Sequence, residues 1–541
     1  MRSVRAVVVS VVVALLAVSC SGGDGGAGEG SGATSSTADG AEPRYGGTLV
    51  VGTNADPGPL NPGITTSVPT HVVTGPMFNG LVGIDQDLQP TPDLATSWQI
   101  SDDGLSATFT LAEDVRWHDG QPFSSADVKF TFEQILLPFS ARTKAALTPV
   151  LAGIDTPDDG TVVFRFSRPY PAFLALIDKV NAPILPRHLY EGTDPMTNPV
   201  NQSPVGTGAF EFGSAVPGNE YRMVRNDDYF KKEGPYLDEI VVRVIPEQAS
   251  LAAAFEAGEV DYLPLPPEAE VDRLAELDGV TATDKGREAF ASVTFLVFNL
   301  ERPALQDRRV REAIALAVDE EFIIDSVLDG NGILTTGPIS PDLATFYSPD
   351  VPVYEPDVER ARGLLADAGA ADVSLTFVHD PSVARLAAVL KDQLDQIGID
   401  LQLVTLERNA WIDRLYKAKD FDLSYTNFEN GPDPAIGVHR AFLSSNIGPV
   451  PFSNAAQYRN PTVDDLLTRA GTTVDTDERV KLYEEFQQIV AEDLPYLYLY
   501  QVDRGVLYRS EFGGLHDDSG KGIIYYEDAY SREGEAQPPS G

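Results

Sequence analysis

The chain has 541 residues, with 81 Asp or Glu against 40 Lys or Arg, so its formal net charge is −41. This length exceeds what one hydrophobic core supports, so we expect two or three domains or lobes. The strong negative charge repels phosphate backbones and excludes nucleic-acid binding, but it does not identify a ligand.

The first twenty residues have the pattern of a secretion signal. A short basic region holding Arg2 and Arg5 precedes an apolar run of about a dozen residues, which suits a signal better than a membrane span. The run ends in AVSC, which resembles the lipobox of bacterial lipoproteins, and Cys20 is the only cysteine of the chain. We expect residues 1–20 to be a lipoprotein signal peptide and Cys20 to be lipidated. An ordinary cleaved signal with a chance cysteine is the alternative.

Residues 21–45 are rich in Gly, Ser and Ala and contain few large apolar side chains. Such a segment cannot form a core, so we interpret it as a disordered tether. Its average reach is on the order of 25–30 Å, enough to hold a globular body clear of a membrane surface.

From Gly46 onward, predicted strands and helices alternate. The predicted strands are apolar or alternating runs: GGTLVVGTN, SATFTLAEDV, GTVVFRFS, VRVI, TFLVFNL and SLTFV. The predicted helices have apolar residues three and four positions apart: VREAIALAVDEEFIIDSVL, ARLAAVLKDQLDQIGI and ERVKLYEEFQQIVAEDLP. Gly398 is expected to cap the second helix, and Pro495 to end the third. Mixed strands and helices predict an α/β fold.

The stretch VRWHDGQPFSSADV raises the question of a metal or catalytic site, because His118 stands beside Asp119 and Asp127 follows eight residues later. A helix begins here, with Ser124 as N-cap and Asp127 placed to complete a capping box. Asp119 precedes a glycine, which is typical of a turn. His118 has no second histidine at ligand spacing, so a local structural role is favoured.

The longer stretch LATSWQISDDGLSATFTLAEDVRWHDGQPFSSADVKFTFEQIL resembles the signature of the family 5 extracellular solute-binding proteins, the oligopeptide-, dipeptide- and nickel-binding components of bacterial ABC importers. The resemblance continues in order through PVGTGAFEF, RNDDYFKKEGPYLDEIVVRVI, FNLERPALQDRRVREAIALAVD, QLDQIGIDLQLV and LYEEFQQIVAEDLPYLYLY. Ala209 stands where the family usually has proline. The resemblance implies a two-lobed periplasmic-binding-protein-like α/β fold with an inserted subdomain in lobe I and a central ligand cleft.

The same resemblance implies a domain division. Its parts are lobe I (46–80, 203–291 and 500–541), the inserted subdomain (81–202) and lobe II (292–499). The runs TFLVFNL and LPYLYLY would then be the two crossings between the lobes.

The function implied by the resemblance is that of an extracytoplasmic substrate-binding lipoprotein, which captures di- or oligopeptides and delivers them to a membrane permease with a separate ATPase. We expect a monomer without cofactor, anchored by its lipid to the outer face of the cell membrane. A binding protein for a nickel chelate, haem or an oligosaccharide, or a ligand sensor, is the main alternative.

A secreted hydrolase is a remote alternative. The six histidines are scattered, and the chain contains no HExxH motif, GxSxG elbow or P-loop. A pair of catalytic acids cannot be singled out among 81 carboxylates. We therefore predict no catalytic residue and no metal ligand.

Two segments are candidates for ligand contact, and the first is TNADPGPLNPG. It follows the first predicted strand, and loops at strand ends of α/β sheets commonly line the ligand crevice. The corresponding loop lies in the cleft of relatives, so Asn54 and Asp56 are candidate ligand-binding residues.

The second segment is YTNFENGPDP. Peptide-binding relatives have here an aromatic residue, which Phe428 most resembles, and then an Asp that pairs with the α-amine of the peptide. That Asp is replaced by Asn430, and a one-residue ambiguity adds Asn427 and Glu429, with Asp433 the last candidate. Core packing for Phe428 and a plain turn at Asp433 are the alternatives. Since asparagine supplies no charge, the α-amine is held by Glu429 or another acid, or is not required.

Overall fold

The computed structural model describes residues 43–65, 67–85, 88–232, 234–267, 270–283, 292–503, 505–515 and 525–535. The predicted signal peptide, Cys20 and nearly all of the predicted tether lie outside the described residues. Within the described ranges, no helix is both long and apolar enough to cross a bilayer.

The first predicted strand lies near the centre of a seven-stranded sheet. We call this sheet and its helices the seven-stranded lobe. Its strands, in sheet order, are β12 (Val280–Thr283), β19 (Val506–Arg509), β11 (Tyr262–Leu263), β1 (Thr48–Thr53), β10 (Glu239–Val244), β9 (Glu220–Arg225) and β8 (Phe210–Val216). β1 and β10 are parallel. Leu49 and Val51 belong to one core cluster, while Val50 packs on another beneath α7 (Gln248–Glu256). Side chains on opposite faces of β1 therefore pack into two different cores, so both faces of the strand are covered.

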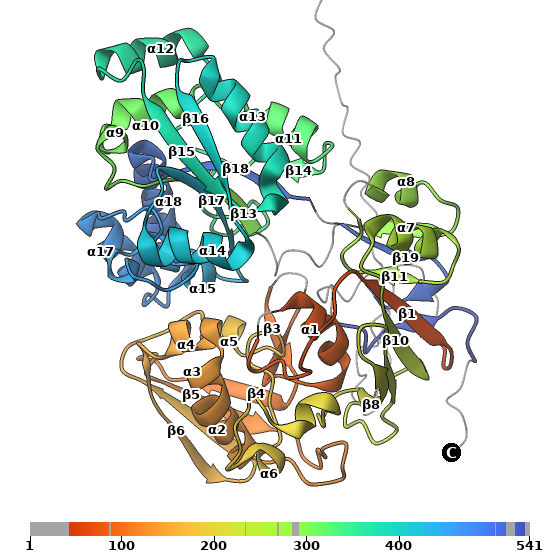
Figure 1. Cartoon of the computed structure of the whole chain (residues 1–541). Helices are drawn as coiled ribbons and strands as arrows, with labels where there is room; N and C mark the ends of the chain where they lie inside the picture. The colour runs from red at the N-terminus through yellow and green to blue at the C-terminus, as the bar shows by residue number, and fades with distance from the viewer. Residues whose placement is uncertain are drawn as a thin grey trace, which may run out of the picture. The chain divides into compact units, whose positions relative to one another are not determined.

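A six-stranded sheet, here the six-stranded lobe with its helices, is built from the later predicted strands. Its order is β14 (Gly332–Ile333), β18 (Tyr496–Val502), β13 (Ser292–Phe298), β17 (Leu423–Glu429), β15 (Ser374–His379) and β16 (Asp400–Thr405). β15 and β16 are parallel and joined by α13 (Ala384–Asp395), which lies beside them in Figure 1. This is a βαβ unit, the usual way to connect parallel neighbours.

Two of the three predicted helices are confirmed. The first of these is α13, which ends before Gly398, where the backbone is left-handed at φ +87°. The other, α18 (Thr476–Asp493), ends just before Pro495.

The remaining predicted helix, VREAIALAVDEEFIIDSVL, was expected to be continuous and is two helices. The first, α10 (Arg308–Ala315), ends early, and α11 (Glu320–Val327) begins anew. Asp319 caps α11 by accepting a hydrogen bond from the Phe322 amide at 2.8 Å. Aspartate at an N-cap stabilises a new helix start, and this local preference interrupts the apolar periodicity.

The runs TFLVFNL and LPYLYLY, predicted as the two crossings, both form strands of one sheet. β13 and β18 pair antiparallel, with Leu296 opposite Leu497. The chain reaches β19 in the other sheet only beyond Val502, and residues 284–291 before β13 lie outside the described ranges. Buried apolar strands of this kind belong to a lobe core, whereas connections between sheets lie at strand ends.

A four-stranded antiparallel sheet forms the centre of a separate core, here the four-stranded subdomain. Its strands are β4 (Ala95–Ile100), β5 (Ser106–Leu111), β7 (Thr161–Phe166) and β6 (Leu151–Asp158). Phe109, Phe132, Phe164 and Phe173 pack edge to face or tilted within it. Between β5 and β6 the chain forms the helices α2 (Ser125–Phe130), the π-helical turn η2 (Thr131–Leu136), α3 (Leu137–Phe139) and α4 (Ala141–Leu147).

The stretch VRWHDGQPFSSADV has the predicted structural role. The carboxylate of Asp127 accepts a hydrogen bond from the Ser124 amide at 2.9 Å, which fixes the start of α2. His118 Nε2 lies 3.0 Å from the Gly208 carbonyl, and its Nδ1 accepts from the Gly206 amide at 3.2 Å. Burial lowers the pKa of His118 to about 4, so the ring is neutral at pH 7 and both donates and accepts. It holds the glycine turn PVGTGAFEF against the four-stranded subdomain.

Candidate functional site

A cavity of about 920 Å³ lies between the four-stranded subdomain and the six-stranded lobe. Among the described residues that line it, four are arginines and one is a glutamate, so we call it the arginine-lined cavity. Its charged lining residues are Arg142, Arg168, Arg408, Arg440 and Glu429. Cavities of this size hold small ligands, and this one has walls from two parts of the chain that have separate hydrophobic cores.

An ion pair joins the two walls. Glu429 ends β17, and its carboxylate accepts from the guanidinium of Arg142 on α4. A second nitrogen of Arg142 donates to the Asn181 side chain at 2.7 Å. Along the end of β17, Asn427 and Glu429 line the cavity while Phe428 between them is buried, as strand alternation requires.

Arg440 is a cavity arginine without an ion-pair partner among the described residues. It lies on α16 (His439–Phe442), where its Nε donates to the Gly437 carbonyl at 3.1 Å and its guanidinium covers the Phe428 ring at 5.1 Å. Throughout the part of the chain that the structure describes, no carboxylate forms an ion pair with it. Burial, and then the like charge of Arg142, lower the pKa of Arg440 to about 10. It therefore stays protonated at pH 7 with its positive charge facing the cavity.

The other two arginines differ in their pairing. Arg408 donates to Asp380 at 2.7 Å and to the Tyr425 hydroxyl at 3.1 Å, so its charge is balanced outside the cavity. Arg168 follows β7, is exposed and has neither an ion pair nor a hydrogen bond to any described residue. Pairing thus leaves Arg168 and Arg440 as the two uncompensated charges of the lining.

The structure places three of the predicted site residues in protein packing rather than at the cavity. Phe428 is buried in the core of the six-stranded lobe. Asn430 is fully buried, and its side-chain oxygen accepts from the Ser340 amide at 2.6 Å. Asp433 accepts two hydrogen bonds of 2.8 Å from Arg479 and caps the short helix α15 (Pro434–Gly437). In this structure, Asn427 and Glu429 are the members of the segment that face the cavity.

The first candidate loop is tied to its own lobe. The Asp56 carboxylate accepts from the Gly218 amide at 2.6 Å and the Tyr221 hydroxyl at 2.9 Å. Burial acts to raise the pKa of Asp56, but these bonds and one from Gly58 outweigh it and lower the pKa below its usual value. Asn54 is half-buried at the end of β1. Neither residue is part of the arginine-lined cavity, so the structure does not bring this loop together with β17.

Sequence reasoning missed the arginines. Arg142 and Glu429 are 287 positions apart, and no local pattern links a residue of α4 to the end of β17. The sequence offers no local signal for this set, because the arginines of the lining come from distant segments and gather only in the folded chain.

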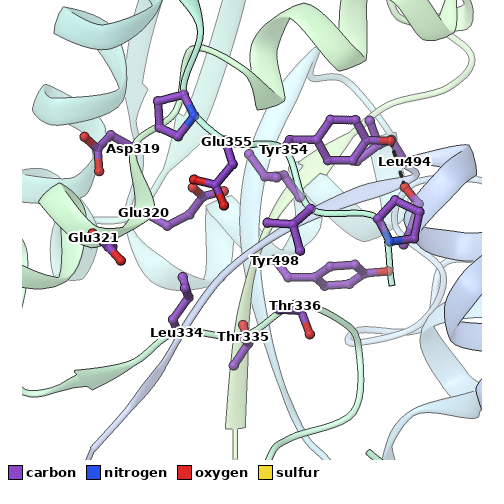
Figure 2. A pocket seen from close by; sticks show the side chains of 15 residues that line it. Asp319, Glu320, Glu321, Leu334, Thr335, Thr336, Tyr354, Glu355, Leu494 and Tyr498 are labelled. Carbon is purple, nitrogen blue, oxygen red and sulfur yellow. Dashed lines mark hydrogen bonds between the residues drawn. The ribbon is translucent and has the colours of Figure 1, made fainter. Parts of the chain in front are cut away.

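A second, smaller pocket of about 290 Å³ lies wholly in the six-stranded lobe (Figure 2). We call it the acid-lined pocket because its lining includes Asp319, Glu320, Glu321 and Glu355. Burial, followed by the charges of these neighbours, raises the pKa of Glu320 to about 8. Over the described ranges, no group of three or more His, Cys, Asp or Glu side chains is arranged to hold a metal ion.

Comparison with known proteins supports a binding role. The family model of bacterial extracellular solute-binding proteins, family 5 (middle region), matches residues 89–449. A probable D,D-dipeptide-binding periplasmic protein of Escherichia coli is 30% identical over 478 residues, which cover 86% of this chain and 91% of that protein.

Two solved structures have the same two-lobed fold. A periplasmic binding protein of Helicobacter pylori in complex with the peptide STSA has a TM-score of 0.76 and 26% identity, covering 91% of this chain and 99% of the other. A binding protein of Agrobacterium tumefaciens in complex with agropinic acid has a TM-score of 0.76 and 25% identity, covering 90% and 99%.

Proposed function

Because the chain belongs to the bacterial extracellular solute-binding proteins of family 5, we propose that it captures peptides outside the cytoplasm and delivers them to the permease of an ABC transporter. The observation that carries the proposal is the cavity of about 920 Å³ whose two walls are bridged by the Arg142–Glu429 pair. Its relatives include proteins named for dipeptide and oligopeptide binding.

The mechanism is binding without chemical turnover. A ligand that contacts Arg142 on one wall and Glu429 on the other stabilises the arrangement in which both walls meet it. The permease then recognises this form, and a separate ATPase supplies the energy. The protein acts as a monomer, since one chain provides both walls.

Attachment is the second part of the proposal. Cys20 is lipidated, and residues 21–45 tether the binding lobes to the outer face of the membrane. Cys20→Ala should release the protein into the soluble fraction or the medium. Unchanged membrane association of this variant would contradict the lipid anchor.

Calorimetric titration with free and N-acetylated peptides tests peptide capture. If Glu429 holds the α-amine, exchanging its pairing with Arg142 for pairing with the ligand, then Glu429→Gln should weaken binding of the free peptides by more than about tenfold. N-acetylated peptides should be affected little, because they carry no ammonium group.

The matched control is Glu484→Gln, which changes an exposed glutamate of α18 and should leave every affinity unchanged. Equal affinity for both peptide forms, with Glu429→Gln silent, would remove Glu429 as the amine anchor. Absence of binding for all peptides tested would reject peptide capture itself.

A further inference from the structure

The arginine-lined cavity has a charge imbalance that a neutral ligand would not correct. Glu429 is neutralised by Arg142, and Arg408 by Asp380. Arg168 and Arg440 remain, and no carboxylate among the described residues pairs with either. Arg440 is half-buried, and a guanidinium partly removed from water without a counter-charge is unfavourable, so an anion that enters the cavity would lower this cost.

The imbalance runs against the composition of the protein. Acidic residues outnumber basic ones by 81 to 40 in the chain, whereas arginines outnumber acids by four to one in the described lining of the cavity. Chance sampling of this sequence would give an acidic lining. The positive charge of the lining is therefore evidence about the ligand of the cavity, whereas the negative charge of the whole chain is not.

Arg440 is the cavity residue best placed to bind an anionic group of a ligand. Its Nε donates a hydrogen bond to the Gly437 carbonyl, and its guanidinium stacks over the Phe428 ring. These two contacts fix the guanidinium plane. Both terminal nitrogens have no partner among the described residues. A planar guanidinium held in this way offers two parallel N–H donors, the geometry that binds a carboxylate bidentately. Arg168, exposed at the rim, adds a second positive charge.

We infer that the cavity selects ligands with net negative charge, and in particular peptides with acidic side chains, through Arg440 and Arg168. This inference rests on the proposed function for the peptide part of the ligand. A zwitterionic peptide has no net charge and leaves both arginines uncompensated overall, whereas each additional carboxylate neutralises one of them. Lysine-containing peptides add a third positive charge and are disfavoured.

The test is a calorimetric titration of the full-length protein with Ala-Glu-Ala, Ala-Gln-Ala and Ala-Lys-Ala, which differ only in the central residue, and with pentapeptides of the same design. We expect the glutamate peptide to bind at least about tenfold more tightly than the glutamine peptide, and the lysine peptide to bind most weakly. Raising the salt concentration should weaken the glutamate peptide more than the glutamine peptide.

Arg440→Gln should reduce the ratio of glutamate to glutamine affinities to less than about threefold. A structural defect would weaken all peptides alike and leave this ratio unchanged. Arg168→Gln, at an exposed position, should reduce the ratio more modestly without affecting folding. Arg469→Gln, on the exposed side of α17 (Pro461–Ala470), is the matched control and should change nothing.

The outcomes separate the inference from the proposed function. Equal affinities for the three peptides, with Arg440→Gln silent, would overturn the inference and leave peptide capture intact. Binding of glutarate, but of no peptide, in a manner that depends on Arg440 would support anion selection and reject peptide capture. Failure of every anion tested to bind would overturn the inference.

Discussion

The arginine-lined cavity and the acid-lined pocket carry opposite charge and differ in how that charge arises. The acid-lined pocket lies within one lobe and repeats the composition of the whole chain, in which acidic residues predominate two to one. The arginine-lined cavity lies between two folded parts and inverts that composition. Only the lining charge of the arginine-lined cavity differs in sign from the charge of the whole chain. That charge is therefore evidence about a ligand, whereas the charge of the acid-lined pocket is what the composition alone would give.

The two cavities also relieve their charge differently. In the acid-lined pocket, Glu320 is protonated at neutral pH because burial and its acidic neighbours raise its pKa to about 8. Arg440 has no such option at neutral pH, since even its lowered pKa lies near 10. Protonation of Glu320 therefore lowers the charge repulsion in the acid-lined pocket, whereas the arginine-lined cavity keeps its positive charge at neutral pH.

The largest effect should come from breaking the support of the arginine-lined cavity. Asp433 and Arg479 form a buried pair, with side chains 8% and 6% exposed, that holds α15 against α18. Asp433→Asn leaves a buried guanidinium without its counter-charge and should cost about 3–5 kcal/mol in the free energy of unfolding. Urea unfolding followed by fluorescence measures it.

Asp465→Asn is the control for this change. It removes an exposed pair with Arg469 on α17 and should cost less than about 1 kcal/mol. Similar losses for both variants would show that burial of the Asp433 pair does not matter.

An intermediate effect is expected at Glu320 in the acid-lined pocket. Its pKa in the folded protein, about 8, lies above its usual value of 4.5, so the fold retains a proton that the unfolded chain releases. This contribution to stability is fully present below pH 4.5 and is lost as the pH rises through 8. Glu320→Gln should therefore gain stability relative to the natural protein on going from pH 5 to pH 8, by about 1–3 kcal/mol.

Thermal or urea unfolding at a series of pH values provides the measurement. Glu321→Gln, at an exposed neighbouring position, should change the pH profile much less. A pH profile for Glu320→Gln parallel to that of the natural protein would mean that Glu320 is ionised at neutral pH.

The smallest effect concerns the hydroxyls beside the same pocket. The Thr335 hydroxyl is buried and has no hydrogen-bond partner among the described residues, whereas the Thr336 hydroxyl lies 3.0 Å from that of Tyr347. Thr335→Val removes an unsatisfied polar group and should be neutral or stabilise by up to about 1 kcal/mol. Thr336→Val breaks a bond and should destabilise by about 1 kcal/mol. A clear loss for Thr335→Val would reveal a partner, such as a buried water or a ligand.

Several features could be predicted from the sequence because they depend on neighbours in the chain. The β-strand at 48–53 follows from its run of consecutive apolar residues, and the start of α2 follows from the three-residue spacing of Ser124 and Asp127. Local preference also explains the one helix that was predicted wrongly, since Asp319 starts a new helix inside an apolar periodicity that reads as continuous. The family resemblance supplied the two-lobed fold, which neither periodicity nor composition specifies.

The candidate site was only partly predictable. The segment around Glu429 was identified, but the sequence did not distinguish Glu429 from Asn430. Glu429 faces the cavity, whereas Asn430 is buried in the six-stranded lobe and accepts a hydrogen bond from the Ser340 amide. Strand alternation requires neighbours to face opposite ways, yet it does not say which of the two faces the ligand. That choice depends on which side of β17 the rest of the lobe covers.

The sequence by itself thus determined the mixed α/β character and the capped helix start at Ser124, since each depends on residues close together in the chain or on composition, and it predicts a secretion signal that lies outside the described residues. Only the tertiary structure decided that Arg142 pairs with Glu429, that no carboxylate in the described ranges pairs with Arg440 and that Asp433 pairs with Arg479. Ion pairing acts over a few ångströms in space and is indifferent to separation along the chain, so the charge of a cavity is fixed by folding, not by composition.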